Sequence, residues 1–286
     1  MADPLTLMAV HAHPDDEAIG TGGILARAAA EGIRTVLVTC TGGEVGEIAP
    51  DTGATLDNLG EIRRRELETA CEILGVSHLE MLGYRDSGMM GTADNAHPDA
   101  FFKADLEHAI SRVIGLVRKY RPAVIVTYDE NGFYGHPDHI NAHRVAAAAY
   151  HRAGDPNHPH HPSDEILEPW APARLFYTAV SKSGVREFSR RIRELGQEGP
   201  GGDGDEGEPS WGVPDELITT HVDVSAHIEQ KRRALFAHAT QMGPEVFFAK
   251  LPEPVFHEMF GREAFRLVQS RTSGPLPTSD LFQGLR

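Results

Sequence analysis

Short apolar runs alternate with helical periodicities along the first half of the chain. Runs rich in Val, Leu and Ile predict buried β-strands at residues 5–12, 33–41, 78–84 and 123–128. Apolar positions near helical spacing predict helices at residues 18–31, 61–74, 106–120 and 137–152. Gly32 and Gly75 follow two of these helices, where a left-handed stop is expected. Because strands separated by helices pair in parallel through right-handed crossovers, the pattern predicts an α/β, Rossmann-like three-layer sandwich with a mostly parallel sheet.

The second half of the chain is less regular. Residues 217–224 are strand-like, and residues 226–240 have helical spacing. The tract at 198–209 contains Gly, Asp, Glu and Pro without an apolar anchor and predicts a flexible loop. Histidines among the prolines of residues 151–162 favour an exposed loop over a metal-binding tract. With no internal repeat and no clear linker, we expect one domain over residues 1–286 with an elaborated C-terminal part.

Composition narrows the classes of function. The formal net charge of −15 argues against a sequence-independent nucleic-acid binder, which needs clustered Lys and Arg, and against docking on an anionic membrane. No apolar run approaches the ~18 residues needed to span a bilayer, and the N-terminus lacks the basic and apolar regions of a secretory signal. Cys40 and Cys71 form no CxxC pair, so neither a disulfide framework nor a thiolate zinc finger is expected. These features predict a cytoplasmic protein and carry no signal of oligomeric state.

Two polar clusters follow predicted strands. Residues 13–17 read HPDDE after the first strand, and residues 136–139 read HPDH after the fourth. Open α/β sheets place their ligand sites outside the carboxyl ends of the strands. We therefore expect the two clusters to form one shared metal site from distant parts of the sequence.

His13, Asp16 and His139 are the candidate metal ligands. His13 and Asp16 lie three residues apart around a Pro-containing turn, and His139 falls in the first turn of the following helix. Two His and one Asp with an open position form a hydrolytic Zn²⁺ arrangement, and the same ligand types also suit non-haem Fe²⁺. His143, one helical turn after His139, is a rival ligand that ranks below His13. His11 is interpreted as a hydrogen-bonded core histidine.

Asp15 and His136 are the candidates for proton transfer. Asp15 adjoins Asp16 and is a natural general base for the water molecule that a metal ion activates. As an imidazolium, His136 could stabilise the oxyanion and protonate the leaving amine. The plainer alternatives are charge near a helix N-terminus for Asp15 and a polar residue before the helix for His136. Glu17 is interpreted as a negative charge that stabilises a helix N-terminus. Asp138 is interpreted either in the same way or as a residue that orients a metal ligand, and not as a ligand itself.

The two clusters resemble those of the PIG-L/LmbE-like zinc deacetylases. Further segments resemble the mycothiol branch of that family, at residues 10–17, 41–47, 85–89, 127–132 and 238–241. The resemblance implies that His13, Asp16 and His139 bind zinc. It also implies that Asp15 is the base and His136 the acid or oxyanion partner.

The same resemblance implies roles for three further residues. Tyr134 would help to polarise the scissile carbonyl, and Arg63 and Asp86 would bind the sugar and the inositol of the substrate. Judged from the residues alone, Tyr134 is a loop aromatic packed on the core. For Arg63, a place on a solvated helix face is an alternative as well supported as the binding role, because Arg64 and Arg65 adjoin it. Asp86 is then a turn-forming residue.

From the resemblance we expect a metal-dependent amidohydrolase that removes the acetyl group from a small glucosaminyl molecule such as N-acetylglucosaminyl-inositol. Residues 18–23 resemble the broad family, and residues 89–92 resemble the deacetylase of the mycothiol branch. Residues 128–139 and 148–150 resemble its mycothiol conjugate amidase, which is the alternative. A non-catalytic, metal-containing sugar-binding protein is an alternative of another class, and a fourth protein ligand would indicate it. A nucleotide enzyme is disfavoured because no GxGxxG follows the first strand.

Overall fold

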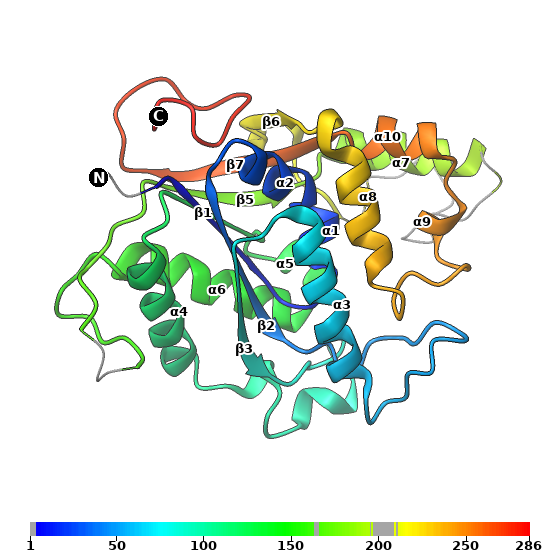
Figure 1. The fold of residues 1–286 in the computed structure, drawn as a ribbon, viewed down its shortest axis with the longest axis horizontal. Helices are drawn as coiled ribbons and strands as arrows, with labels where there is room; N and C mark the ends of the chain where they lie inside the picture. Colours follow the sequence, from blue (N-terminus) through cyan, green and yellow to red (C-terminus); the bar gives the residue numbers. More distant parts are fainter. Residues whose placement is uncertain (1–3, 163–165, 195, 197–208, 210) are drawn as a thin grey trace.

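The computed structural model of the chain describes residues 4–162, 166–194, 196, 209 and 211–286. One sheet runs through this part of the chain in the strand order β3-β2-β1-β4-β5-β7-β6 (Figure 1). The strands are β1 (Thr6–His11), β2 (Arg34–Thr41), β3 (His78–Tyr84), β4 (Val124–Thr127), β5 (Arg174–Ala179), β6 (Thr220–Asp223) and β7 (Arg262–Ser270). β1 to β5 pair in parallel, whereas β7 is antiparallel to both β5 and β6. The predicted α/β fold with a mostly parallel sheet is confirmed.

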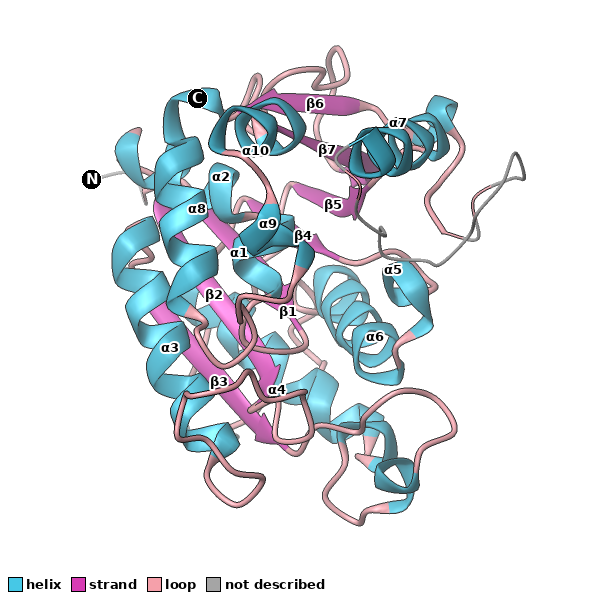
Figure 2. Cartoon of the chain, turned by 90° about the vertical axis from the view of Figure 1, so that its right-hand side faces the viewer, coloured by secondary structure: helices cyan, strands magenta, loops and turns pink. Residues whose placement is uncertain are grey.

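Helices cover both faces of this sheet. They are α1 (Asp16–Gly20), α2 (Gly22–Ala30), α3 (Leu59–Leu74), α4 (Leu106–Tyr120), α5 (Gly132–Gly135), α6 (Pro137–Arg152), α7 (Lys182–Glu194), α8 (Ile228–Ala237), α9 (Phe247–Lys250) and α10 (Glu253–Phe260). The core on one face includes side chains of α2, α3, α8 and α10, and the core on the other includes those of α4 and α6 (Figure 2). The predicted three-layer arrangement follows from these two cores.

Alternate side chains of β1 enter the two cores. Leu7 and Ala9 pack on the side of α2 and α3, and Met8 and Val10 pack on the side of α4 and α6. All four are fully buried. A central parallel strand has both faces covered by helices, so its sequence is a continuous apolar run without polar alternation.

The position of β1 in the sheet determines where a site can form. β1 lies between β2 and β4, and the chain turns to opposite sides of β1 to reach these two neighbours. Such a reversal of strand order opens a crevice at the carboxyl ends of the strands. The loops after β1 and β4 therefore meet at this crevice.

Most predicted elements of the first half are confirmed, including α4 and α6 with their expected bounds. Gly32 and Gly75 adopt the expected left-handed conformation, with φ of 74° and 72°. The helix predicted at 18–31 divides at Thr21 into α1 and α2, and the one predicted at 226–240 ends at Ala237. β5, α7 and β7 were not predicted.

Apart from Pro209, the predicted loop at 198–209 lies outside the described residues. Cys40 and Cys71 are buried free thiols. Among the described helices, none combines the length and apolar composition that crossing a lipid bilayer requires.

Candidate metal centre

Two segments build the candidate site: the loop after β1 and the start of α6. His13 lies in the loop, and Asp16 is the first residue of α1. Pro137 occupies the first turn of α6, where its missing N–H has no helical partner to lose. The N-cap is His136, whose Nδ1 accepts a hydrogen bond from a backbone N–H of that turn at 3.2 Å. His139 in the same turn faces the loop after β1.

The three predicted ligands present their donor atoms to one another. His13 Nδ1 lies 3.4 Å from Asp16 Oδ2 and 3.3 Å from His139 Nε2. His139 Nε2 lies 3.5 Å from Asp16 Oδ1. A tetrahedral zinc ion with N and O ligands at their usual bond lengths has ligand–ligand separations of about 3.3–3.6 Å. The donor types and their spacing therefore fit a zinc ion.

The charge states of two of these groups also suit a cation. Burial would raise the pKa of Asp16, but the facing His139 and His13 hold it well below its usual range. Burial lowers the pKa of His139 to about 4, against the effect of Asp16. A carboxylate and a neutral imidazole are the forms that bind metals.

Two carboxylates, those of Asp138 and Asp86, lie on the Nε2 side of the His13 ring. On the side of the ring away from Nδ1, His13 Nε2 is 3.3 Å from Asp138 Oδ2 and 3.6 Å from Asp86 Oδ1. Ser87 donates its N–H to Asp138 Oδ2 at 2.8 Å and its hydroxyl to Oδ1. Burial opposes charge on His13, but hydrogen bonds to the surrounding carboxylates, that of Asp138 foremost, raise its pKa well above 6.5. Carboxylates in this position orient a ligating imidazole, which supports the interpretation of Asp138 as a support of a ligand.

Asp15 is held beside the ligands in an unusual backbone conformation. Its φ of 105° and ψ of −28° are rare for a residue other than glycine. Arg63 donates to Asp15 Oδ2 at 3.1 Å, to the Pro14 carbonyl and, at 2.9 Å, to the Gly43 carbonyl. Burial raises the pKa of Asp15 to about 6, against the lowering effect of Arg63. A carboxylate with this pKa can accept a proton near neutral pH.

Arg63 and Asp86 both lie inside the protein. Arg63 is 3% exposed, so the alternative of a solvated helix face is wrong. Asp86 accepts the Gly88 N–H at 2.8 Å, which forms a turn, and its own N–H donates to Glu44 Oε2 at 2.8 Å. Burial would raise the pKa of Asp86, but His13 holds it well below its usual range. Roles of Arg63 and Asp86 in substrate binding stay predictions.

His136 and Tyr134 border the ligand cluster. The His136 ring lies 4.6 Å from that of His13, and the Tyr134 ring lies 5.0 Å from that of His139. Burial, aided by the neighbouring His13 and His139 rings, lowers the pKa of His136 to about 4. Because Nδ1 of His136 accepts a backbone N–H, the ring proton belongs on Nε2. The geometry therefore favours a neutral His136 over the imidazolium expected from the sequence.

Three further residues at or next to the cluster were not predicted from the sequence. The Tyr128 ring stacks on His139 at 4.2 Å. Ser87 binds the carboxylate behind His13, and Glu44 binds the backbone next to that cluster. All three follow the carboxyl ends of strands β4, β3 and β2. The strand-end rule would have found them if it had been applied to every predicted strand.

The two other candidate histidines have structural partners. His11 is fully buried, with Nε2 2.9 Å from Thr21 Oγ1 and Nδ1 3.2 Å from the Tyr128 hydroxyl. Its interpretation as a hydrogen-bonded core histidine is confirmed. The rival ligand His143 places Nδ1 3.0 Å from the Tyr128 carbonyl, which occupies that nitrogen.

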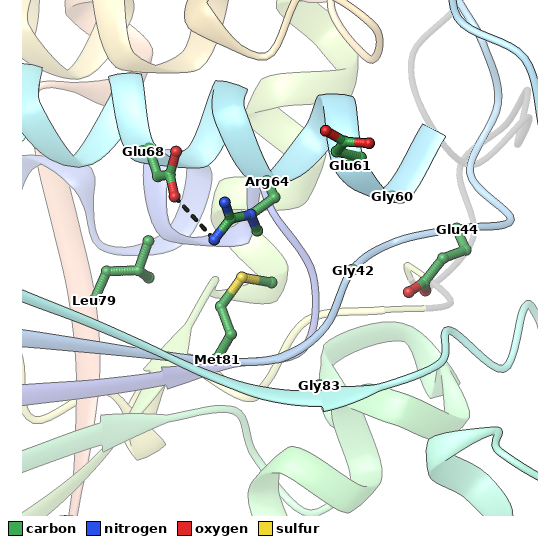
Figure 3. A pocket seen from close by; sticks show the side chains of 9 residues that line it. All are labelled: Gly42, Glu44, Gly60, Glu61, Arg64, Glu68, Leu79, Met81 and Gly83. Carbon is green, nitrogen blue, oxygen red and sulfur yellow. Dashed lines mark ion pairs between the residues drawn. The ribbon is translucent and has the colours of Figure 1, made fainter. Parts of the chain in front are cut away.

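A pocket of about 590 Å³ opens between α3 and β3 (Figure 3). Arg64 and Glu68 form an ion pair of 3.2 Å along α3, opposite Leu79 and Met81 of β3. Glu44 lines this pocket and also accepts the backbone N–H of Asp86, whose side chain lies beside His13. The three predicted ligands do not line the pocket.

Comparisons with known proteins identify the family of this chain. The sequence matches the family described as "PIG-L: GlcNAc-PI de-N-acetylase" over residues 8–150. Two relatives share the name "1D-myo-inositol 2-acetamido-2-deoxy-alpha-D-glucopyranoside deacetylase". The one from Geodermatophilus obscurus is 42% identical over 290 residues, which cover 98% of this chain and 97% of the relative. The one from Thermobispora bispora is 45% identical over 291 residues, which cover 96% of this chain and 91% of the relative.

A solved structure shares the fold. The N,N'-diacetylchitobiose deacetylase of Pyrococcus horikoshii superposes with a TM-score of 0.63 and 20% sequence identity. The superposition covers 93% of this chain and 84% of the other. The likeness extends beyond the matched family region to the C-terminal part of the sheet.

Proposed function

Because this chain belongs to the PIG-L family, we propose that it is a zinc-dependent deacetylase that hydrolyses the acetamide of N-acetylglucosaminyl-inositol. The observation that carries the proposal is the convergence of His13 Nδ1, the Asp16 carboxylate and His139 Nε2 within 3.5 Å of one another, beside the half-buried Asp15. The naming of full-length relatives as deacetylases of this substrate supports the choice of substrate.

His13, Asp16 and His139 would hold the zinc ion. When bound, zinc lowers the pKa of a water molecule and polarises a carbonyl oxygen. Three protein ligands leave a position open for substrate or water, as in catalytic sites, whereas a structural site is closed by four. The deacetylase names of the relatives favour an enzyme over a non-catalytic binding protein.

Asp15 is the proposed general base. Its carboxylate accepts the proton of the water molecule that attacks the acetamide, and its pKa of about 6 keeps it mostly ionised at neutral pH. The proton that it takes is then available to the amine that leaves. The hydrogen bond from Arg63 orients one carboxylate oxygen during this exchange.

His136 and Tyr134 are proposed to stabilise the oxyanion. The neutral His136 carries a proton on Nε2 that it can donate to the carbonyl oxygen. Tyr134 is 48% exposed at the edge of the cluster, where it can reach the same oxygen. Burial raises the pKa of Tyr134, so its hydroxyl stays protonated and remains a donor.

Arg63 and Asp86 are proposed to act on substrate binding in different ways. Asp86 lies beside His13 and can accept a hydrogen bond from a sugar or inositol hydroxyl. The buried Arg63 would contribute through Pro14 and Asp15, whose positions it fixes.

The test is an assay of the zinc-loaded protein with two substrates, N-acetylglucosaminyl-inositol and a mycothiol conjugate. The released acetate is measured for the first substrate, and the carboxylic acid released by amide cleavage is measured for the second. We expect acetate release from the first substrate, loss of that activity in the metal-free protein, and slower cleavage of the conjugate. Cleavage of the conjugate alone would assign the protein as a conjugate amidase. No turnover of either amide at full zinc loading would contradict the proposal.

A further inference from the structure

The backbone at the proposed base needs external support. Asp15 has φ of 105°, a backbone conformation that is strained for a residue other than glycine. The conformation persists only where neighbouring groups hold it. Two groups do so from opposite sides: Arg63, already described, and Glu17.

Glu17 holds the backbone nitrogen of Asp15. The N–H of Asp15 donates to Glu17 Oε2 at 3.0 Å. Glu17 is fully buried, so its carboxylate needs a partner for its other oxygen. The interpretation of Glu17 as helix-dipole charge therefore misses its main contacts.

The partner of that oxygen is His238. Its Nε2 lies 2.7 Å from Glu17 Oε1, and both side chains are fully buried. Among the described residues, Nδ1 of His238 has no hydrogen-bond partner. The bond to Glu17 is thus the polar interaction that this ring makes. His238 follows α8, 221 residues from Glu17 and outside the region that matches the family.

The position of His238 is fixed by α3. Thr240 donates its N–H and its hydroxyl to the two carboxylate oxygens of Glu66, at 2.7 and 2.6 Å. Glu66 lies three residues after Arg63, so both are on one face of α3. One face of α3 therefore supports Asp15 in two ways. Arg63 bonds its side chain directly, and Glu66 bonds Thr240, two residues after His238, which in turn bonds Glu17.

We propose that His238 is a positioning residue for the proposed base: it orients Glu17, which holds the backbone N–H of Asp15. The inference rests on the proposed function in so far as Asp15 is the general base. It assigns a role in the reaction to the C-terminal part of the chain. Among the described residues, the His238 ring hydrogen-bonds Glu17 and none of the three proposed ligands.

The contact is tested first without substrate. Amide hydrogen exchange is measured for peptides that cover residues 13–17 in the zinc-loaded wild type and in His238→Leu, which removes the donor at similar volume. We expect faster exchange in His238→Leu and near-normal exchange in His238→Gln, whose amide N–H can replace the lost donor. The matched control is Leu235→Ala, which removes a buried apolar side chain from α8, the helix that His238 follows. We expect normal exchange of residues 13–17 in this control. Unchanged exchange in His238→Leu would overturn the inference.

The catalytic consequence is tested next, at equal zinc content. We expect kcat of His238→Leu to fall about 10- to 100-fold with KM nearly unchanged, since displacing a supporting group misplaces the reacting group. His238→Gln should recover most of the loss, and Leu235→Ala should keep normal kcat. Normal kcat in His238→Leu, or zinc loss that accounts for its lower activity, would overturn the inference. An inactive wild type would contradict the proposed function instead, while the exchange result still decides whether His238 supports residues 13–17.

Discussion

Nδ1 of His13 and Nε2 of His139 lie 3.3 Å apart, although 126 residues separate them in the chain. The two nitrogens meet because β1 and β4 are neighbours in a parallel sheet, so that the chain leaves both strands at the same edge. An Asp16 carboxylate approaches both nitrogens. The proposed metal centre is thus a consequence of strand order.

Replacing His139 should remove the metal. His139→Ala deletes one of three proposed ligands, so we expect its zinc content after gel filtration to fall well below one ion per chain. His143→Ala is the control, because His143 lies one turn later on α6 and bonds the Tyr128 carbonyl. Elemental analysis of both variants checks the prediction. Full zinc in His139→Ala, or zinc loss in His143→Ala alone, would reverse the assignment.

Replacing Asp15 should stop turnover and leave the metal in place. Asp15→Asn preserves the shape of the side chain but removes the base, so kcat should fall by about 10²–10⁴-fold at normal zinc content. Steady-state kinetics with parallel metal analysis measures both quantities. Asp51→Asn is a matched control, because Asp51 also has a positive φ but is exposed. A normal rate for Asp15→Asn would exclude Asp15 as the base.

Removing zinc should lower thermal stability. A ligand that binds only the folded state at 100 times its Kd stabilises that state by about 2.7 kcal/mol. For a chain of this size that corresponds to a Tm shift of roughly 4–5 °C. Differential scanning calorimetry should show the shift on chelation, its reversal on adding zinc, and a much smaller response in His139→Ala. Equal responses in the two proteins would place the stabilising zinc elsewhere.

Breaking the buried ion pair of the C-terminal part should destabilise the fold. Lys231 Nζ lies 2.7 Å from Glu263 Oε1, and both residues are at most 5% exposed. Glu263 also accepts the N–H groups of Gly23 and Ile24 at the start of α2. Lys231→Met leaves a buried carboxylate without its cation, so we expect a loss of about 3–5 kcal/mol in the free energy of unfolding, measured by urea denaturation.

An exposed pair provides the comparison for Lys231→Met. Arg65 and Glu61 are both 66% exposed, so Arg65→Ala should cost less than about 1 kcal/mol. Similar losses of unfolding free energy in Arg65→Ala and Lys231→Met would contradict the prediction that the buried pair contributes more to stability than the exposed one.

The sequence predicted the first half of the fold better than the second for a physical reason. β1, β2 and β4 are apolar runs, and helices separate the strands from β1 to β4 along the chain. Strands that alternate with helices are typical of a parallel α/β sheet. β7 is an antiparallel strand whose nine residues include only four that are apolar, and several of them are half-buried. Its place beside β5 depends on tertiary packing that local periodicity does not encode.

The candidate site shows the same division. His13, Asp16 and His139 could be proposed together because each follows a strand with a clear apolar pattern. Arg63 could not be distinguished from its neighbours on α3, because only helix phase turns it inward. His238 is a single histidine beyond a helix, and its contact with Glu17 becomes visible only when the chain is folded.

The central claim is that one zinc ion lies between His13 Nδ1, Asp16 and His139 Nε2. Anomalous diffraction at the zinc edge from crystals of the zinc-loaded protein tests it most directly. The account predicts a single strong peak bonded to these three groups, with the remaining coordination position free of protein. A peak on the opposite side of the His13 ring, among Asp86, Asp138 and His136, or a fourth protein ligand, would contradict it.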